Sequence, residues 1–177
     1  MVYREVKAEE IGKDFFRHFQ RHQTVEQCWR KLDGVWTVRN ISFVEDWTEE
    51  DYTKLRASLK DILAAGGVLY GAFLQDEIKG FAALKSSRFG SRREYIDLAE
   101  LYVSQEVRGT GIGRRLFQLA KEWARRQGAE KLYLSAHSSI ESQAFYRAVG
   151  CVEALEYNEE LVRLEPCDCQ LECSLLD

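Results

Sequence analysis

Apolar residues in the N-terminal third of the chain follow helical spacing in some segments and strand-like spacing in others. Alternation over residues 2–6 predicts a short strand. The next apolar residues keep helical spacing and predict a helix; they are Ile11, Phe15, Phe16 and Phe19. The pattern is weaker beyond them: residues 25–32 fit a helix, and residues 35–44 fit an irregular segment or a strand.

A clearer helix signal begins at Thr48. Threonine is a favourable N-cap residue, and the acidic residues 49–51 that follow place negative charge at the positive end of a helix. Apolar residues then continue at helical spacing as far as Gly66 and Gly67. The sequence therefore predicts a long helix between Thr48 and this glycine pair.

Strand signals dominate the middle of the chain. Residues 68–74, 78–84 and 95–103 are predicted strands, with a polar loop over residues 86–93. A glycine-rich turn then opens an amphipathic helix that runs to about Gln127, with Gly128 as its C-cap. A strand over residues 131–136, a helix over residues 140–149 and two short strands complete the pattern. Strands that come together first and then alternate with helices predict a mixed α/β fold.

Composition narrows the class of protein. The 177 residues are 45% hydrophobic and 31% charged, which suits one globular domain with a sizeable core and excludes intrinsic disorder. The net charge of −4 argues against nucleic acid or an anionic membrane as partner. The longest apolar run, residues 62–74, contains three glycines and is shorter than the roughly 20 residues of a membrane span.

Cysteine use and the N-terminus bear on compartment and metal binding. The N-terminus lacks the apolar core of a secretory signal, so we expect a cytoplasmic protein with reduced thiols. Cys167, Cys169 and Cys173 form a C-x-C-x3-C pattern, whereas zinc sites usually pair cysteines as C-x2-C with a fourth ligand nearby. We therefore expect structural or incidental thiols and no metal site.

The candidate chemistry begins at the glycine-rich turn, residues 108–113. Free backbone N–H groups at the start of a helix bind anions, and glycines let a bulky anion approach the backbone. Arg108, Arg114 and Arg115 add positive charge. The spacing matches neither the dinucleotide G-x-G-x-x-G fingerprint nor a P-loop. Two interpretations stay open from the residues alone: a pyrophosphate-binding turn, or a tight strand-to-helix turn with a basic face.

Two motifs resemble a known family. Arg108-x-x-Gly111-x-Gly113 resembles the acetyl-CoA signature R/Q-x-x-G-x-G/A of the GNAT superfamily of N-acyltransferases. Residues 139–151, SIESQAFYRAVGC, resemble its second signature, close to N-x-x-A-x-x-F-Y-x-x-x-G-F, with Ser139, Ser142 and Cys151 where Asn, Ala and Phe are common. The motifs occur in the family's order and spacing, and the resemblance extends from about residue 68 to the C-terminus.

The resemblance implies the fold and its division. The expected class is α/β (mixed α+β), with a central, mostly antiparallel sheet, a splayed pair of parallel strands and helices on both faces. Residues 1–177 would form a single acetyltransferase domain. Residues 1–67 would supply a strand and helices on the acceptor side, residues 68–136 the central strands and the acetyl-CoA-binding turn and helix, and residues 137–177 the last helix and strands.

The resemblance also implies the activity: an N-acetyltransferase that moves an acetyl group from acetyl-CoA to a primary amine by direct attack in a ternary complex. Acetyl-CoA would be the co-substrate, with no metal, and the acceptor would be a small-molecule or protein amine. The residues implied to bind acetyl-CoA are Leu101, Tyr102, Val103, Arg108, Gly109, Thr110, Gly111, Ile112, Gly113, Arg114, Ser139 and Ser142.

Three residues are the candidate catalytic groups. Tyr146 matches the family's tyrosine, a general acid for the departing thiolate, and its alternative role is to pack with Phe145 on an amphipathic helix. Asp97 and Glu100 are both candidate bases. Alternation along a strand places these two on opposite faces unless a bulge intervenes, and an ion pair with a nearby arginine is the alternative for either.

The acceptor side is implied to lie in the stretch Trp29–Trp47, which contains Trp36 and Phe43, and in the loop over residues 86–93. The alternative role of these aromatic residues is to pack in the core. Glu45, Asp46 and the acids at 49–51 would attract a cationic amine, but we interpret them as acids of a helix start, which need no ligand.

Two further classes remain as alternatives. One is a GNAT-shaped CoA-binding or sensory module without turnover. The other is a metal-binding protein that uses the C-terminal thiols and would purify with zinc. A two-fold homodimer, the commonest assembly of soluble proteins, is the default expectation for any oligomer.

Overall fold

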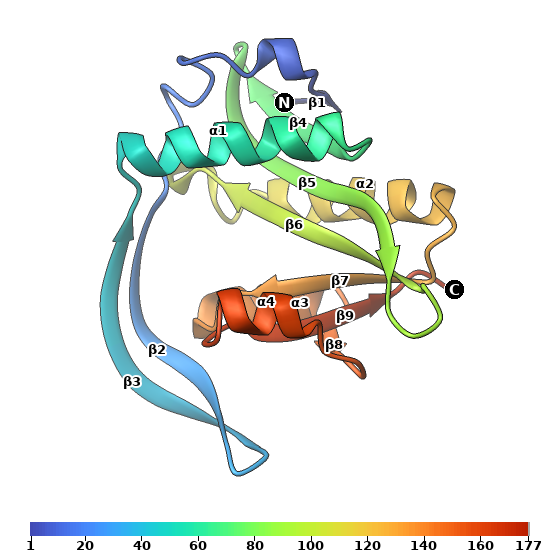
Figure 1. Cartoon of the computed structure of the whole chain (residues 1–177). Helices are drawn as coiled ribbons and strands as arrows, with labels where there is room; N and C mark the ends of the chain where they lie inside the picture. The colour runs from blue at the N-terminus through green and yellow to red at the C-terminus, as the bar shows by residue number, and fades with distance from the viewer. Residues whose placement is uncertain (177) are drawn as a thin grey trace.

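A computed structural model describes residues 1–176 as a seven-stranded sheet with a separate two-stranded hairpin (Figure 1). The strand order in the sheet is β1-β4-β5-β6-β7-β9-β8. Its strands are β1 Val2–Glu5, β4 Val68–Leu74, β5 Glu77–Phe89, β6 Tyr95–Val103, β7 Lys131–Ala136, β8 Val152–Glu153 and β9 Cys169–Ser174. The hairpin strands are β2 His22–Leu32 and β3 Val35–Asp46, and the helices are α1 Glu49–Ala64, α2 Ile112–Arg126, α3 Ile140–Ala148 and α4 Glu159–Leu164.

One parallel pair interrupts the otherwise antiparallel sheet. β6 and β7 run parallel and pair only over Tyr95–Asp97 and Lys131–Tyr133. Beyond Asp97 the two strands diverge, and Figure 1 shows them opening away from each other. The fold class is therefore confirmed: a mostly antiparallel sheet with a splayed parallel pair and helices on both faces.

Two apolar cores lie on the two faces of the sheet. The buried side of α2 packs with alternate residues of β4 to β7, and α3 extends this core. The buried side of α1, Leu55, Leu59 and Ile62, packs on the opposite face of β4 and β5. The predicted cap of α1 is present: Thr48 and Asp51 form a reciprocal capping box.

Two predicted helices are wrong. The segment carrying Phe15, Phe16 and Phe19 forms turns after a 3-10 helix at Ala8–Glu10. The rings of Phe16 and Phe19 pack against Phe81. Clustered aromatic residues filled this core without a regular helix. Residues 25–32 belong to strand β2, and a register shift between Val25 and Gln27 breaks the alternation that would have revealed it.

The polar loop predicted for residues 86–93 is also shorter than expected. Strand β5 continues to Phe89, which pairs with Tyr95 and stacks on its ring. A six-residue helix near the C-terminus, α4, was not predicted. None of the helices among residues 1–176 is long and apolar enough to cross a bilayer.

Candidate active site

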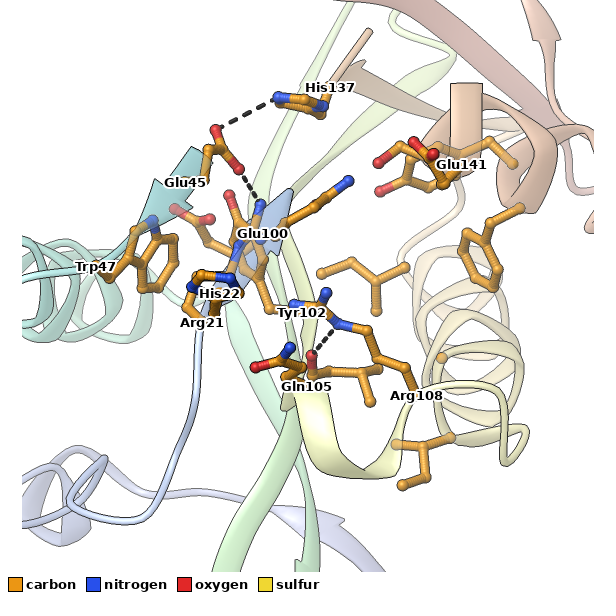
Figure 2. A pocket seen from close by; sticks show the side chains of 18 of the residues that line it. Arg21, His22, Glu45, Trp47, Glu100, Tyr102, Gln105, Arg108, His137 and Glu141 are labelled. Atoms are coloured by element: carbon orange, nitrogen blue, oxygen red, sulfur yellow. Dashed lines mark hydrogen bonds and ion pairs between the residues drawn. The ribbon is translucent and has the colours of Figure 1, made fainter. Parts of the chain in front are cut away.

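A cavity of about 1190 Å³ follows β6 from the point where it leaves β7 to the start of α2. One half of its wall is the end of β6, the glycine turn and α3. The other half contains the start of β2, the end of β3 and the residue after β7, which carry the labelled residues His22, Glu45 and His137 in Figure 2. The first half of α1 and the segment after α4 complete it. The splayed strands therefore open one continuous space between the sheet, the hairpin and the helices α1, α2 and α3.

Two glycines form the open wall of the turn. Gly109 and Gly111 line the cavity with φ angles of 76° and 89°, a left-handed conformation that favours glycine. No neighbouring group lies within 4 Å of a Cβ placed on either residue, so a side chain there would project into open space. Gly113 has a different role, because its Cβ would lie 3.3 Å from a ring atom of Phe145 and it therefore lets α2 and α3 approach closely.

The start of α2 carries unpartnered donors. Gly111 is the N-cap and supplies no side chain to the first turn. The first backbone bond of the helix is donated by Arg115 to the Gly111 carbonyl, at 3.1 Å. The N–H groups of residues 112–114 thus have no acceptor among residues 1–176, at the positive end of the helix.

The end of β6 offers free backbone groups as well. Ser104 donates its N–H to Lys79 on β5. By strand alternation, the backbone groups of Tyr102 also face β5, whereas those of Leu101 and Val103 face the gap left by β7. The N–H groups of Leu101 and Val103 are therefore available to a ligand in the cavity.

The predicted basic residues at the turn are present with partners of their own. Arg108 lines the cavity, and its Nε donates to the Val103 carbonyl at 3.1 Å. Arg114 also lines the cavity and reaches the Ala148 carbonyl at 3.4 Å. Thr110 does not line the cavity. Its hydroxyl donates to the Val107 carbonyl at 2.7 Å, which stabilises the turn.

Ser139 is placed differently from the prediction. Its side chain is fully buried and caps α3, where its hydroxyl oxygen accepts from the Ser142 N–H. It also accepts from the Gln23 side chain at 3.2 Å. These bonds occupy the polar group that was expected to meet a cofactor, so only Ser142 reaches the cavity wall.

Tyr146 lines the cavity from α3, with its ring edge-to-face against Phe145. Its hydroxyl has no hydrogen-bond partner in the described part of the chain. Burial, then the nearby Cys151 and acidic residues, raise the pKa of Tyr146, so the phenol keeps its proton and can act as a donor.

Glu100 and Asp97 share one side of β6 because the required bulge exists. Ala83 pairs with Glu100 but Leu84 pairs with Leu98, which leaves Ala99 as an extra residue. Glu100 lines the cavity and has no hydrogen bond or ion pair with any of residues 1–176. Asp97 lies outside the cavity wall, buried, with Lys85 at 2.9 Å.

Burial raises the pKa of Glu100 to about 8, and the negative charges of Glu165 and Asp97 add to this effect. A carboxyl group with such a pKa exchanges protons near neutral pH. Glu100 can therefore accept a proton from a group bound beside it, whereas Asp97 is held in an ion pair with Lys85.

The acceptor side was predicted only in part. Trp47 and Glu45 line the cavity, but Trp36, Phe43 and residues 86–93 do not. Glu49 and Glu50 are indeed acids of a helix start, and Asp51 serves the cap. The interpretation of Glu45 and Asp46 as such acids is wrong, because both lie at the end of β3, and Glu45 faces the cavity.

Several lining residues were not identified from the sequence. Arg21 is buried between the rings of Trp47 and Tyr102 and binds Glu45. His137 meets the other oxygen of Glu45 at 3.3 Å (Figure 2). Glu165 and Asp168 follow α4, which was not predicted. The position of His137 directly after a predicted strand that leads to the site is the one signal that could have indicated it.

The C-terminal thiols do not converge. Cys169 and Cys173 point into the core from β9, and Cys167 is exposed. Among residues 1–176, no group of three or more His, Cys, Asp or Glu side chains could hold a metal ion.

Comparisons with known proteins agree with this geometry. The model of the acetyltransferase (GNAT) family matches residues 32–151. The crystal structure of nourseothricin acetyltransferase has a TM-score of 0.70 at 16% identity, with 98% of each chain covered. A provisionally assigned streptothricin acetyltransferase from Bacillus anthracis str. Ames, solved in complex with acetyl coenzyme A, has a TM-score of 0.69 at 19% identity, with 98% of this chain and 97% of that chain covered.

Aminoglycoside 6'-acetyltransferase type Ii has a TM-score of 0.61 at 16% identity, with 100% of this chain and 99% of that chain covered. Identities this low establish a common fold and nothing finer. A comparison with curated protein sequences gives no match.

Proposed function

Because the chain belongs to the GNAT family of acetyltransferases, we propose that it transfers the acetyl group of acetyl-CoA to a primary amine by direct attack in a ternary complex. One observation carries this proposal. A single cavity joins an anion-binding glycine turn, free backbone N–H groups of β6 and an unpartnered carboxylate, Glu100.

The residues present fit acetyl-CoA. The free N–H groups of residues 112–114, with Arg108 and Arg114 beside them, suit a pyrophosphate. A Cβ on Gly109 or Gly111 would occupy the space that this group needs. When bound, acetyl-CoA supplies a thioester carbonyl that an amine can attack. The N–H groups of Leu101 and Val103 would donate to the carbonyl oxygen as negative charge develops on it.

We assign the general base to Glu100. An alkylammonium group has a pKa near 10.4 and attacks only after it loses its proton. Glu100 accepts this proton, directly or through one water, as the new C–N bond forms. Asp97 contributes through its charge, which helps to raise the pKa of Glu100.

We assign the general acid to Tyr146. As the C–S bond breaks, the phenol donates its proton to the departing sulfur, so that free thiol and amide are the products. Its raised pKa ensures that the proton is present at neutral pH. A side chain with no competing hydrogen bond among residues 1–176 is free to make this contact.

Structural neighbours support an amine as acceptor. The names of these neighbours describe acetyl transfer to streptothricin and to an aminoglycoside, and one of the structures holds acetyl coenzyme A. Glu45, Glu100, Glu165 and Asp168 give the acceptor half of the cavity in this chain an acidic wall, which suits a basic substrate.

Calorimetry tests the proposal first. Acetyl-CoA and CoA are titrated into the purified protein, with ATP and NAD as control ligands. Micromolar binding that is selective for acetyl-CoA and CoA is expected, followed by free-thiol release when amines are added. Absence of acetyl-CoA binding would refute the assignment of the turn, and binding without thiol release from any amine would leave a CoA-binding module instead.

A further inference from the structure

Glu45 is held in place from two sides. One carboxylate oxygen accepts from Arg21 Nη2, and the other lies 3.3 Å from His137 Nε2 (Figure 2). Arg21 itself is only 6% exposed, is fixed over the rings of Trp47 and Tyr102, and binds Gln23 through its other terminal nitrogen. The clamp therefore joins the start of β2, the end of β3 and the end of β7.

The hydrogen bonds assign the proton of His137. Its Nδ1 accepts from the Ser139 N–H at 3.2 Å, so the neutral ring carries its proton on Nε2, the atom that faces Glu45. Both ring nitrogens are thereby occupied. His137 has no lone pair left for a substrate and acts on the site by holding Glu45.

Glu45 nevertheless keeps free acceptor capacity. A carboxylate offers about four lone-pair sites, of which the clamp uses two. The hydrogen bond from His137 and the charge of Arg21 lower the pKa of Glu45 despite its partial burial. Glu45 therefore remains ionised under the conditions in which Glu100 exchanges its proton.

The surrounding wall adds negative charge. Besides Glu45 and Glu100, the acids that line the cavity are Asp51, Glu141, Glu165 and Asp168. Apart from Arg108 and Arg114 at the start of α2, the lining lysines and arginines are Arg21, which is held by Glu45, and Lys54, which is exposed and paired with Glu50 at 2.7 Å. Burial raises the pKa of Asp168 to about 7 and that of Glu100 to about 8, so these acids can become neutral by taking up a proton, whereas Glu45 stays ionised. A cation that pairs with the free side of Glu45 would therefore come from the ligand.

A reacting amine cannot supply that charge at the moment of attack, because it must be neutral to attack. An anchor that stays ionised therefore works best on a second cationic group of the same molecule. We propose that Glu45, clamped by Arg21 and His137, binds such a second cationic group, so that the acceptor is a diamine or polyamine-like molecule whose other amine meets Glu100. This inference rests on the proposed function.

The first experiment compares two acceptors, 1,5-diaminopentane and 1-aminopentane, by free-thiol release. Glu45→Gln should lower kcat/KM for the diamine by about 10- to 100-fold, the worth of one charged hydrogen bond, mainly through KM. The value for the monoamine should stay within about twofold. Asp46→Asn is the matched control, because it removes one negative charge at the next position, outside the cavity wall, and should change neither value.

His137 provides the second variant, which keeps the Arg21–Glu45 pair intact if Glu45→Gln impairs folding. His137→Ala should raise KM for the diamine with little change in kcat, and His137→Gln, which keeps an N–H donor, should restore most of the affinity. A merely structural role would lower kcat for both amines together, which would overturn the assignment.

The failure of this inference differs from that of the proposed function. Equal kcat/KM for the two amines, or equal losses of both in Glu45→Gln, would reject the anchor and leave the acetyltransferase intact. If no amine releases thiol, the inference is tested by measuring the binding of 1,5-diaminopentane to the protein–CoA complex. Weaker binding to Glu45→Gln than to Asp46→Asn would support the anchor, and equal or undetectable binding would reject it.

Discussion

At the level of single residues, Glu45 and Glu100 face one cavity but have opposite surroundings. Glu45 accepts from an arginine and a histidine, whereas Glu100 has no partner in the described chain and lies near two other carboxyl groups. One carboxylate is thus kept ionised and the other is kept ready to take a proton. Environments that separate the pKa values of two acids also separate their roles.

The pKa of Glu100, about 8, predicts the pH profile of the reaction. A base works only in its unprotonated form, so the rate should rise with pH up to about 8 and then level. The amine also titrates, but its contribution is common to wild type and Glu100→Gln, and the ratio of the two profiles isolates Glu100. At pH 8 this variant should be about 10²- to 10⁴-fold slower. A constant ratio between pH 6 and 9 would exclude Glu100 as the base.

Tyr146→Phe removes one oxygen and keeps the packing against Phe145. Without the proton donor, kcat should fall by about 10²- to 10⁴-fold, while calorimetry should give an unchanged affinity for acetyl-CoA. Full activity in this variant would move the role of general acid to another group.

At the level of elements, the glycine turn makes a prediction that separates backbone strain from ligand exclusion. Gly111→Glu should weaken acetyl-CoA binding by at least about 100-fold, or about 2.8 kcal/mol, because a charged side chain would fill the anion site. Gly34, at the hairpin tip, has a similar φ of 78° and equally open surroundings. Gly34→Glu therefore introduces the same strain away from the cavity and should bind acetyl-CoA like wild type; equal losses in both variants would reject the turn as the binding site.

The elements differ in how far the sequence could predict them. Val68–Leu74, Tyr95–Val103, Lys131–Ala136 and α1 were predictable, because their apolar periodicity and their caps are local properties. Strand β2 was missed because its bulge breaks the alternation, although its partner β3 follows directly after the Asp33-Gly34 turn, a local hairpin signal. The end of β5 was also not predicted, because its sequence is polar. The strand continues there because Phe89 pairs with Tyr95 and stacks on its ring.

The same distinction holds for the site. The glycine turn and Tyr146 lie in contiguous motifs, so the sequence indicated them. The clamp on Glu45 joins three segments that only the fold brings together, and no short pattern contains it. Glu100 was predictable as a candidate, but its preference over Asp97 depends on a bulge and on Lys85, which are properties of the folded sheet.

At the level of the whole molecule, the hairpin completes the site because it is fixed to the segment between β7 and α3. Trp29 donates its N–H to the Ser138 carbonyl at 2.8 Å, and the backbones of Cys28 and Ser139 form an isolated antiparallel β-bridge. The far part of the hairpin is tied to β8: Glu153 accepts from Lys31 at 2.5 Å and from Trp36 at 3.0 Å. Movement of the hairpin would therefore move Glu45 relative to Glu100.

The hydrogen bonds of Glu153 predict that the free energy of unfolding depends on pH. Burial alone would raise the pKa of Glu153, but hydrogen bonds from Lys31, Tyr157 and Trp36 outweigh it and lower the pKa from 4.5 to about 2. Because the folded-state pKa is the lower one, the stabilisation is present above about pH 4.5 and is lost as the pH falls toward 2. Glu153→Gln should thus lower the free energy of unfolding in urea by about 1 kcal/mol at pH 7, since the site is partly exposed.

The difference between this variant and wild type should shrink steadily below pH 4.5, the usual pKa of the carboxyl group. Glu26→Gln is the control, because Glu26 is an exposed residue of the same hairpin and should show no difference at any pH. A pH-independent loss in Glu153→Gln would mean that packing, and not the ionised carboxylate, holds the hairpin. The anchor and the base would then keep their relative positions in acid, and the hairpin would be no weaker there than at neutral pH.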